Sequence, residues 1–362
     1  MSRIIVLFSV AVIATTAMLA QNTIFVRTAG NDASNGSSEG SAKKTLAAAL
    51  AAASSGDIID IGPGSFAGGP ISKGVVIQGA NANNALSLWD TPTIITSTLT
   101  LDEKAAGTVL TLVGLQFGQI VPLAGRCENA NLTIYNCKFN ASKPITTTGS
   151  SWAELFLTAS QFEGRPEGAK PGAPLAPLAI KGGDVGITVI RENIFRNYGS
   201  SAVDVSGGGQ ILRLSFNEYV NCNASPAADM AAVRVDATKI EQELTIENSV
   251  FASNATSVVV SGAIAGKTVV VQRNSFRQTP AGSVALKNLA ASTLDATCNA
   301  FNVATKDKDK ALDAKVISAS VRKLVSGAVT ISPTNLDATD TNGDSIGFEP
   351  DASKGCAGSI VD

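Results

Sequence analysis

The chain has 362 residues, of which 44% are apolar and 16% charged, a balance typical of an ordered protein with a sizeable core. Its formal charge of −2 provides no basic excess for binding nucleic acid or anionic lipid. It contains no histidine, which excludes Ser-His-Asp and Cys-His catalysis, histidine-ligated metals and a histidine general base. Any catalysis must therefore use aspartate, glutamate, lysine, arginine or tyrosine side chains.

Residues 1–20 have the pattern of a secretory signal peptide. Arg3 precedes an apolar run over 4–20, with small residues at Ala17 and Ala20. A membrane anchor is the alternative, but about 17 residues is the short limit for a spanning helix. We therefore expect cleavage, a secreted or cell-surface protein, and no membrane span in the mature chain.

Residues 21–56 predict an N-terminal strand followed by a short capping helix. Thr45 is a suitable N-cap, Leu46 and Leu50 share an apolar face with the intervening alanines, and Gly56 can end the helix. Such a helix covers a sheet edge that would otherwise be open.

Residues 57–303 repeat a short phrase: a β-rich apolar stretch, then an asparagine, then an aromatic residue two or three positions later. Examples are TVIRENIF (188–195) and VVVQRNSF (269–276). A second β-rich phrase follows in most units, such as VDV (203–205) and VRV (233–235). The aromatic residues, spaced by 22 to 33 positions, are Phe117, Phe139, Phe162, Phe195, Tyr219, Phe251, Phe276 and Phe301.

This repeat favours a parallel β-helix over the other repeat architectures. Two or three strands per unit without a regular helix exclude a βαβ fold, the leucine-rich signature is missing, and a propeller blade needs about 40 residues. In a β-helix each side chain stacks on its equivalent one coil away, about 4.8 Å along the axis. We therefore predict an asparagine ladder and an aromatic ladder, with a solenoid of about ten coils.

Both ends of the chain resemble a known superfamily. The segment FVRTAGNDASNGSSEGSAKKTLAAALAAASSGDIIDIGPGSF (25–66) is similar to the entry segment of the pectin-lyase-like, right-handed parallel β-helix superfamily. Residues 326–351 are similar to its closing strand and tail. The resemblance implies a single-stranded right-handed β-helix over 57–303, followed by a C-terminal loop, short helix and closing strand over 304–362.

The resemblance also implies a carbohydrate setting, because active members of the superfamily mostly act on acidic polysaccharides. The catalytic motifs of its pectate lyases, polygalacturonases and pectin methylesterases are absent from this sequence. The mechanism left open is that of calcium-dependent polysaccharide lyases, which use a lysine or arginine base with carboxylates and cleave by β-elimination.

Four side chains are candidates for that chemistry. If the valines of VDV and VRV point inward, Asp204 and Arg234 form one outward row and Asp236 lies in the next, which we expect Lys181 to join. A cation or calcium on a uronate carboxylate would acidify the α-proton, and Lys181 or Arg234 would remove it. The alternative is an ordinary pair of opposite charges on neighbouring strands.

The C-terminal region contains a candidate calcium site. Asp337, Asp340, Asn342 and Asp344 cluster oxygen ligands suited to calcium, although their spacing is not that of an EF-hand and a solvated turn is the alternative. No other cofactor is indicated. The apolar spacing over 311–325 predicts the short helix in this region.

The five cysteines leave the redox question open. Cys127–Cys137 and Cys298–Cys356 are conceivable disulfides, and buried free thiols, including Cys222, are the alternative.

The sequence therefore predicts a secreted or cell-surface β-helix module without catalytic activity, which has a structural role or binds glycans. Its expected partners are polysaccharides or other extracellular proteins. A calcium-dependent polyuronate lyase is the first alternative, and a subunit of an extracellular filament or sheath is the second.

Overall fold

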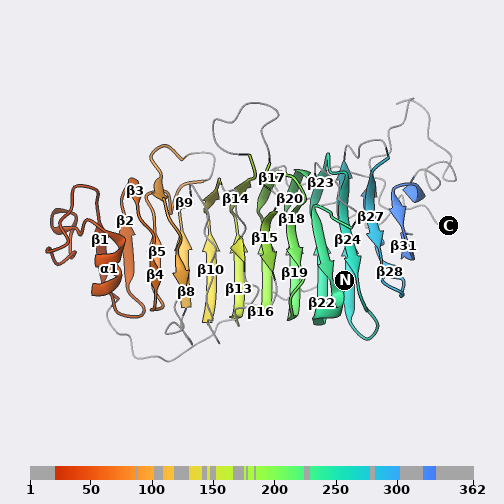
Figure 1. The fold of residues 1–362 in the computed structure, drawn as a ribbon, viewed down its shortest axis with the longest axis horizontal. Coiled ribbons are helices and arrows are strands. Elements are labelled where there is room, and N and C mark those ends of the chain that lie inside the picture. The colour runs from red at the N-terminus through yellow and green to blue at the C-terminus, as the bar shows by residue number, and fades with distance from the viewer. Residues whose placement is uncertain are drawn as a thin grey trace, which may run out of the picture.

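The computed structural model describes residues 21–85, 89–101, 109–117, 130–140, 145–146, 152–165, 175–176, 178–182, 185–223, 229–277, 282–301 and 321–331. These residues form an elongated all-β structure with long parallel sheets, consistent with a β-helix or solenoid (Figure 1). The predicted signal peptide, the candidate calcium ligands and most of the predicted helix over 311–325 lie outside the described residues.

Three sheets run along the described chain, and we name them by a distinguishing feature. The long sheet contains β1 (Thr23–Val26), β2 (Ile58–Ile61), β5 (Val76–Gln78), β8 (Val109–Val113), β10 (Ala130–Tyr135), β13 (Trp152–Thr158), β16 (Val185–Arg191), β19 (Gly209–Ser215), β22 (Ile240–Glu247), β25 (Thr268–Gln272), β28 (Leu294–Asp295) and β31 (Val329–Thr330).

The aromatic sheet contains β3 (Gly64–Phe66), β6 (Thr93–Ile95), β9 (Leu115–Phe117), β11 (Lys138–Phe139), β14 (Gln161–Glu163), β17 (Ile194–Tyr198), β20 (Glu218–Cys222), β23 (Val250–Ala252), β26 (Ser275–Arg277) and β29 (Ala300–Phe301). The short sheet contains β12 (Ile145–Thr146), β15 (Leu178–Gly182), β18 (Ser201–Val205), β21 (Val233–Asp236), β24 (Thr256–Ser261), β27 (Val284–Asn288) and β30 (Val325–Ser326). Strands β4 (Pro70–Ile71) and β7 (Thr100–Leu101) pair separately.

Successive strands enter the three sheets in turn. Strand β16 belongs to the long sheet, β17 to the aromatic sheet, β18 to the short sheet, and β19 pairs in parallel with β16 again. Each repeat of the sequence is therefore one circuit, and the prediction of an all-β fold built from stacked parallel strands is confirmed.

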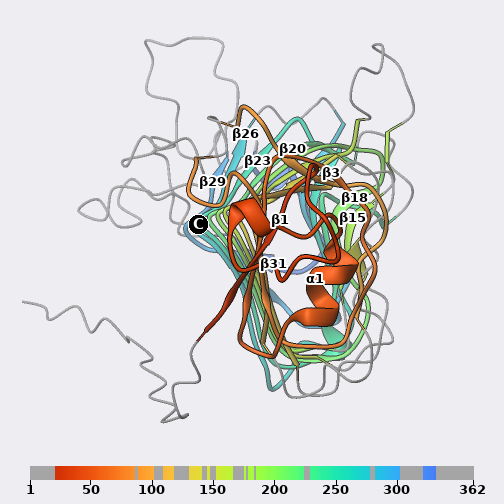
Figure 2. The same cartoon turned by 90° about the vertical axis from the view of Figure 1, so that its left-hand side faces the viewer.

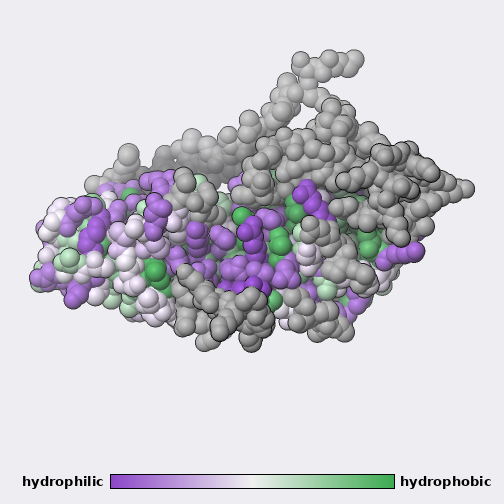
Figure 3. Space-filling model, turned by 90° about the horizontal axis from the view of Figure 1, so that it is seen from above, coloured by the Kyte–Doolittle hydropathy of each residue, from purple (hydrophilic) through white to green (hydrophobic). Residues whose placement is uncertain are grey.

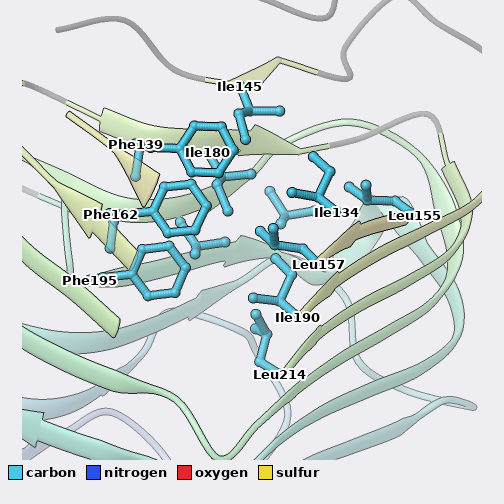
Figure 4. Close-up of a cluster of buried hydrophobic side chains, with 14 of the residues drawn as sticks. Ile134, Phe139, Ile145, Leu155, Leu157, Phe162, Ile180, Ile190, Phe195 and Leu214 are labelled. Carbon is cyan, nitrogen blue, oxygen red and sulfur yellow. The ribbon is translucent and has the colours of Figure 1, made fainter. Parts of the chain in front are cut away.

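The aromatic ladder is present as predicted. The eight rings from Phe117 to Phe301 stack in order along the aromatic sheet, with neighbouring centroids 4.5 to 5.1 Å apart. This separation follows from the spacing of adjacent strands. In Figure 4 the rings of Phe139, Phe162 and Phe195 lie one above another beside the aliphatic side chains of the long sheet. The stack thus forms one part of the core, together with aliphatic side chains from the other sheets.

A polar ladder lies beside the rings and contains four of the repeated asparagines, as predicted, together with serines and a cysteine. It uses the residue two positions before each aromatic residue, and each backbone N–H donates to the side chain one coil further on. The N–H of Ser160 donates to Asn193 Oδ1 at 2.9 Å, and that of Asn193 donates to Asn217 Oδ1 at 3.0 Å. The ladder contains Cys137, Ser160, Asn193, Asn217, Ser249, Asn274 and Asn299.

The asparagines three positions before the aromatic residue do something else. Asn136 and Asn248 adopt φ values of 50° and 52° at the corner between the long and aromatic sheets. Residues in the equivalent place, such as Glu192 and Arg273, also have positive φ. The predicted asparagine ladder is therefore confirmed in part, and Asn136 and Asn248 lie outside it because asparagine also suits left-handed backbone positions.

The N-terminal cap forms largely as predicted. Helix α1 (Leu46–Ala52) begins after Thr45, whose hydroxyl accepts from the Ala48 N–H at 3.1 Å, and it ends four residues before Gly56. Lys73 Nζ donates to the carbonyl oxygens of Leu50 and Ala53 at the helix C-terminus. Two short 3-10 helices, η1 (Glu39–Ser41) and η4 (Ala237–Lys239), also occur in the described chain.

The outer edge of β1 is covered by the loop that precedes α1. The Phe25 N–H donates to Gly36 O at 2.8 Å, and Phe25 O accepts from the Lys43 N–H at 2.9 Å. Figure 2 shows β1 and α1 lying across this end of the strand stack. The backbone N–H and C=O of Phe25 on this edge are thus already hydrogen-bonded and closed to another chain.

The cysteines settle one of the two proposed pairings. Cys137 and Cys222 are free and buried, which rules out a Cys127–Cys137 disulfide and confirms the alternative of buried free thiols for these two residues. Cys137 Sγ instead donates to the carbonyl oxygens of Leu112 and Tyr135 inside the core. Cys298 is disulfide-bonded.

No helix in the described part of the chain has the length and apolar character needed to cross a membrane.

Replacing Tyr219 by phenylalanine should stabilise the protein. The Tyr219 hydroxyl is buried without a hydrogen-bond partner, and burial raises its pKa well above the usual value. Removing it should increase the free energy of unfolding by about 1–3 kcal/mol, measured by urea titration. Tyr219→Leu, which also removes the ring contacts to Phe195 and Phe251, should destabilise the protein instead. A loss of stability in Tyr219→Phe would contradict the prediction.

Asn274→Ala should break the polar ladder. Its side chain accepts from the buried Ser249 N–H and donates to Ile246 O, and both backbone groups would lose their partner. The expected loss is about 2–4 kcal/mol in the same titration. Asn248→Gly is the control, because glycine tolerates the positive φ there and the change should stay below about 1 kcal/mol. Equal losses in both variants would refute the separate roles of the two positions.

Candidate functional site

A row of charged side chains crosses the outer face of the short sheet. The register of the parallel strands places Lys181 opposite Asp204, Asp204 opposite Arg234, Arg234 opposite Val259, and Val259 opposite Lys287. Each of the strands β15, β18, β21, β24 and β27 therefore contributes one side chain. We call Lys181, Asp204, Arg234, Val259 and Lys287 the ionic row.

Two aspartates, Asp204 in the row and Asp229 beside it, form ion pairs with cations of the row. Arg234 Nη1 donates to Asp204 Oδ1 at 2.9 Å, and the two side chains are 28% and 13% exposed. Lys287 Nζ donates to Asp229 Oδ1, also at 2.9 Å, so the segment before β21 contacts the far end of the row. Val259 is fully buried between the two pairs. Figure 3 shows another face, on the side of the aromatic sheet, where hydrophilic residues also gather over the middle.

Lys181 does not lie in the row that was predicted for it from the sequence. We expected it beside Asp236, but it lies opposite Asp204. The reason is the register of β15, in which Ile180 pairs with Val203 rather than with Val205. The Lys181 side chain is exposed and has no ion-pair partner in the described part of the chain.

Asp236 has a structural role. It is the N-cap of η4, and its Oδ1 accepts from the Thr238 N–H at 3.0 Å. Lys267 Nζ donates to the carbonyl oxygen of Ala237, the first residue of this turn, at 2.7 Å. The structure thus brings Lys181, Asp204 and Arg234 into one row and leaves Asp236 in the adjacent turn.

Sequence analysis missed Lys287 and Asp229. Lys287 on β27 lies in the row, whereas Ala285, two residues earlier on the same strand, is buried. One signal was available: LAIK (178–181) and VALK (284–287) share a pattern that ends in lysine, so both lysines were candidates for the same position. Asp229 is not part of a repeated phrase, so no comparable signal in the sequence indicated it.

The described residues offer no cluster of three or more cysteine, aspartate or glutamate side chains that could hold a metal ion. Buried thiols are not nucleophiles either. Burial raises the pKa of Cys137 to about 12, so this thiol stays protonated at neutral pH. Burial also raises the pKa of Cys222. The side chains that the ionic row itself offers include lysine and arginine, which suit ionic recognition of carboxylates.

The three cations of the row follow a regular spacing. Lys181, Arg234 and Lys287 lie on β15, β21 and β27, which are every second strand of the short sheet. With strands about 4.8 Å apart, neighbouring cations are about 10 Å apart along the solenoid axis. An extended polymer with regularly spaced carboxylates matches this arrangement.

No family model, curated protein or solved structure matches this chain.

Removing the Asp236 side chain should affect stability. Asp236→Ala loses the N-cap hydrogen bond to Thr238 and should lower the free energy of unfolding by about 1 kcal/mol. Asp236→Ser, which can still cap the turn, should retain most of the stability. Unchanged stability in Asp236→Ala would contradict the capping role.

Proposed function

We propose that the chain is a secreted or cell-surface module of the pectin-lyase-like class, a right-handed β-helix of about ten coils that binds acidic polysaccharide without cleaving it. The ligand would lie along the ionic row, with its carboxylates toward Lys181, Arg234 and Lys287. Polysaccharide is the expected partner, and no cofactor is required for binding.

The alternate-strand spacing of the three cations supports this proposal most directly. One cation alone would be an ordinary surface charge. A straight row with a constant repeat can contact several carboxylates of one polymer, so that weak contacts add through effective concentration. Lys181, the exposed cation without a partner in the described chain, is the group most accessible to such a ligand.

Binding is favoured over polysaccharide lyase activity by the state of the ion pairs. A β-eliminating lyase needs an unprotonated base beside the α-proton and a cation on the carboxylate. Arg234 is held by Asp204, and Asp236 is used as an N-cap. These contacts oppose a role as the base for either side chain, whereas Arg234 has further N–H donors for a ligand carboxylate, and a calcium-dependent lyase is the alternative outcome of the test below.

A filament subunit is the less favoured alternative. End-to-end assembly requires an open strand edge, and the edge of β1 is covered by the segment containing Gly36 and Lys43. Pro70 also lies on β4, at the N-terminal end of the pair β4–β7. Both features oppose strand pairing with a second chain at this end.

Affinity electrophoresis tests the proposal. The purified protein should be retarded in gels that contain polygalacturonate or alginate, and Lys181→Ala/Lys287→Ala should weaken the apparent affinity by roughly tenfold, equivalent to two contacts of about 0.7 kcal/mol each. Lys44→Ala/Lys323→Ala removes the same charge from exposed positions outside the row and should bind like the wild type. Binding should also weaken with added salt.

Two results would overturn the proposal. Equal weakening by both double variants would mean that net charge, and not the ionic row, attracts the polymer. Absorbance from an unsaturated uronate product in the presence of calcium would establish lyase activity instead.

A further inference from the structure

The outer face of the long sheet carries exposed apolar side chains that the ionic row does not involve. Val109 on β8 is 57% exposed and Tyr135 on the adjacent β10 is 45% exposed. Leu289, in the segment after β27, is the other large apolar residue of comparable exposure in the described chain. Two of these three residues thus lie on neighbouring strands of one sheet.

Tyr135 is part of a small aromatic surface. It lies opposite Val113 on one side and Thr158 on the other. Phe156, two residues before Thr158 on β13, points to the same outer face and is half-buried. Tyr135 and Phe156 are therefore diagonal neighbours on adjacent strands, within reach of one extended ligand.

Unpaired hydroxyl groups surround the two rings. Thr111 on β8, Thr133 on β10 and Thr158 on β13 lie on the outer face, since their neighbours Leu110, Leu112, Leu132, Ile134, Leu155 and Leu157 point into the core. None of these three threonine side chains has a hydrogen-bond partner in the described chain. The surface thus combines ring faces with free donors and acceptors.

Charge is nearly absent from this part of the face. Glu154 is the one charged side chain among the described outward positions from β5 to β13, and its Oε2 accepts from Asn131 Nδ2 at 2.9 Å. Beyond β16 the same face changes character: Arg213 pairs with Glu243 through two contacts of 2.7 Å, and Arg273 pairs with Glu247. The uncharged part therefore has a boundary within the sheet.

We propose that this uncharged surface, formed by Val109, Thr111, Thr133, Tyr135, Phe156 and Thr158, binds a neutral polysaccharide. The apolar C–H face of a sugar ring packs on an aromatic ring, and its hydroxyl edge is satisfied by threonine hydroxyls. A lack of charge on the surface matches a lack of charge on the ligand, whereas a polyuronate would lose water from its carboxylates without gaining a cation. The surface is on a different sheet from the ionic row, so the two sites are independent.

The test uses affinity electrophoresis of the full chain in gels containing hydroxyethylcellulose, xyloglucan, galactomannan or soluble β-1,3-glucan. The wild type should be retarded by at least one of these polymers, and Tyr135→Ala should reduce that affinity at least fivefold. Leu289→Ala is the matched control, since it removes an apolar side chain of similar exposure elsewhere and should not change retardation. Tyr135→Phe should retain binding, because it keeps the ring.

Electrophoresis in gels with acidic polymers distinguishes this proposal from the one for the ionic row. Tyr135→Ala should still bind polygalacturonate or alginate, and Lys181→Ala/Lys287→Ala should still bind the neutral polymer. Absence of retardation by all four neutral polymers, or equal loss in Leu289→Ala, would overturn the inference. So would sedimentation showing that the wild type self-associates and that Tyr135→Ala does not, because the occupant would then be a second copy of the chain.

Discussion

The fold depends on the corner that joins the long sheet to the aromatic sheet. At the corners from β8–β9 onward one residue adopts positive φ, and the next residue turns its side chain or backbone toward the equivalent position one coil away. The corner takes the chain from one sheet to the next within about two residues, and the polar ladder satisfies the buried backbone groups at this turn. The aromatic residue then enters the core two positions later, so the ring stack is positioned by the corner before it.

Charges on the outer faces follow from the same regularity. A parallel register aligns one side chain per coil, so any residue type that recurs at the same phase produces a straight row. The ionic row and the uncharged surface of the long sheet are two results of this rule. The core accepts only side chains that stack, whereas the outer positions are free to vary and carry whatever recognition the protein has.

The sequence predicted the aromatic ladder, since its ring positions recur without ambiguity. The sequence did not distinguish two classes of asparagine, because the ladder position and the positive-φ position are adjacent in the chain and asparagine is favoured at both. The ionic row was predicted only in part, because no residue type recurs at one position of the short sheet as the aromatic residue does in the aromatic sheet. The expected register at Ile180 differed by two residues from the observed one, so Lys181 was assigned to the wrong row. Asp236 was misjudged because a capping carboxylate and a catalytic one look alike in sequence.

The corners of the solenoid are not equally constrained. Two residues separate β16 from β17 and two separate β22 from β23, whereas the connections from the aromatic sheet to the short sheet extend from Tyr198 to Ser201 in one circuit and from Cys222 to Val233 in the next. The second kind of corner therefore accommodates insertions without shifting the rings. New loops, and with them new specificities, can be gained there during evolution while the strands keep their alignment.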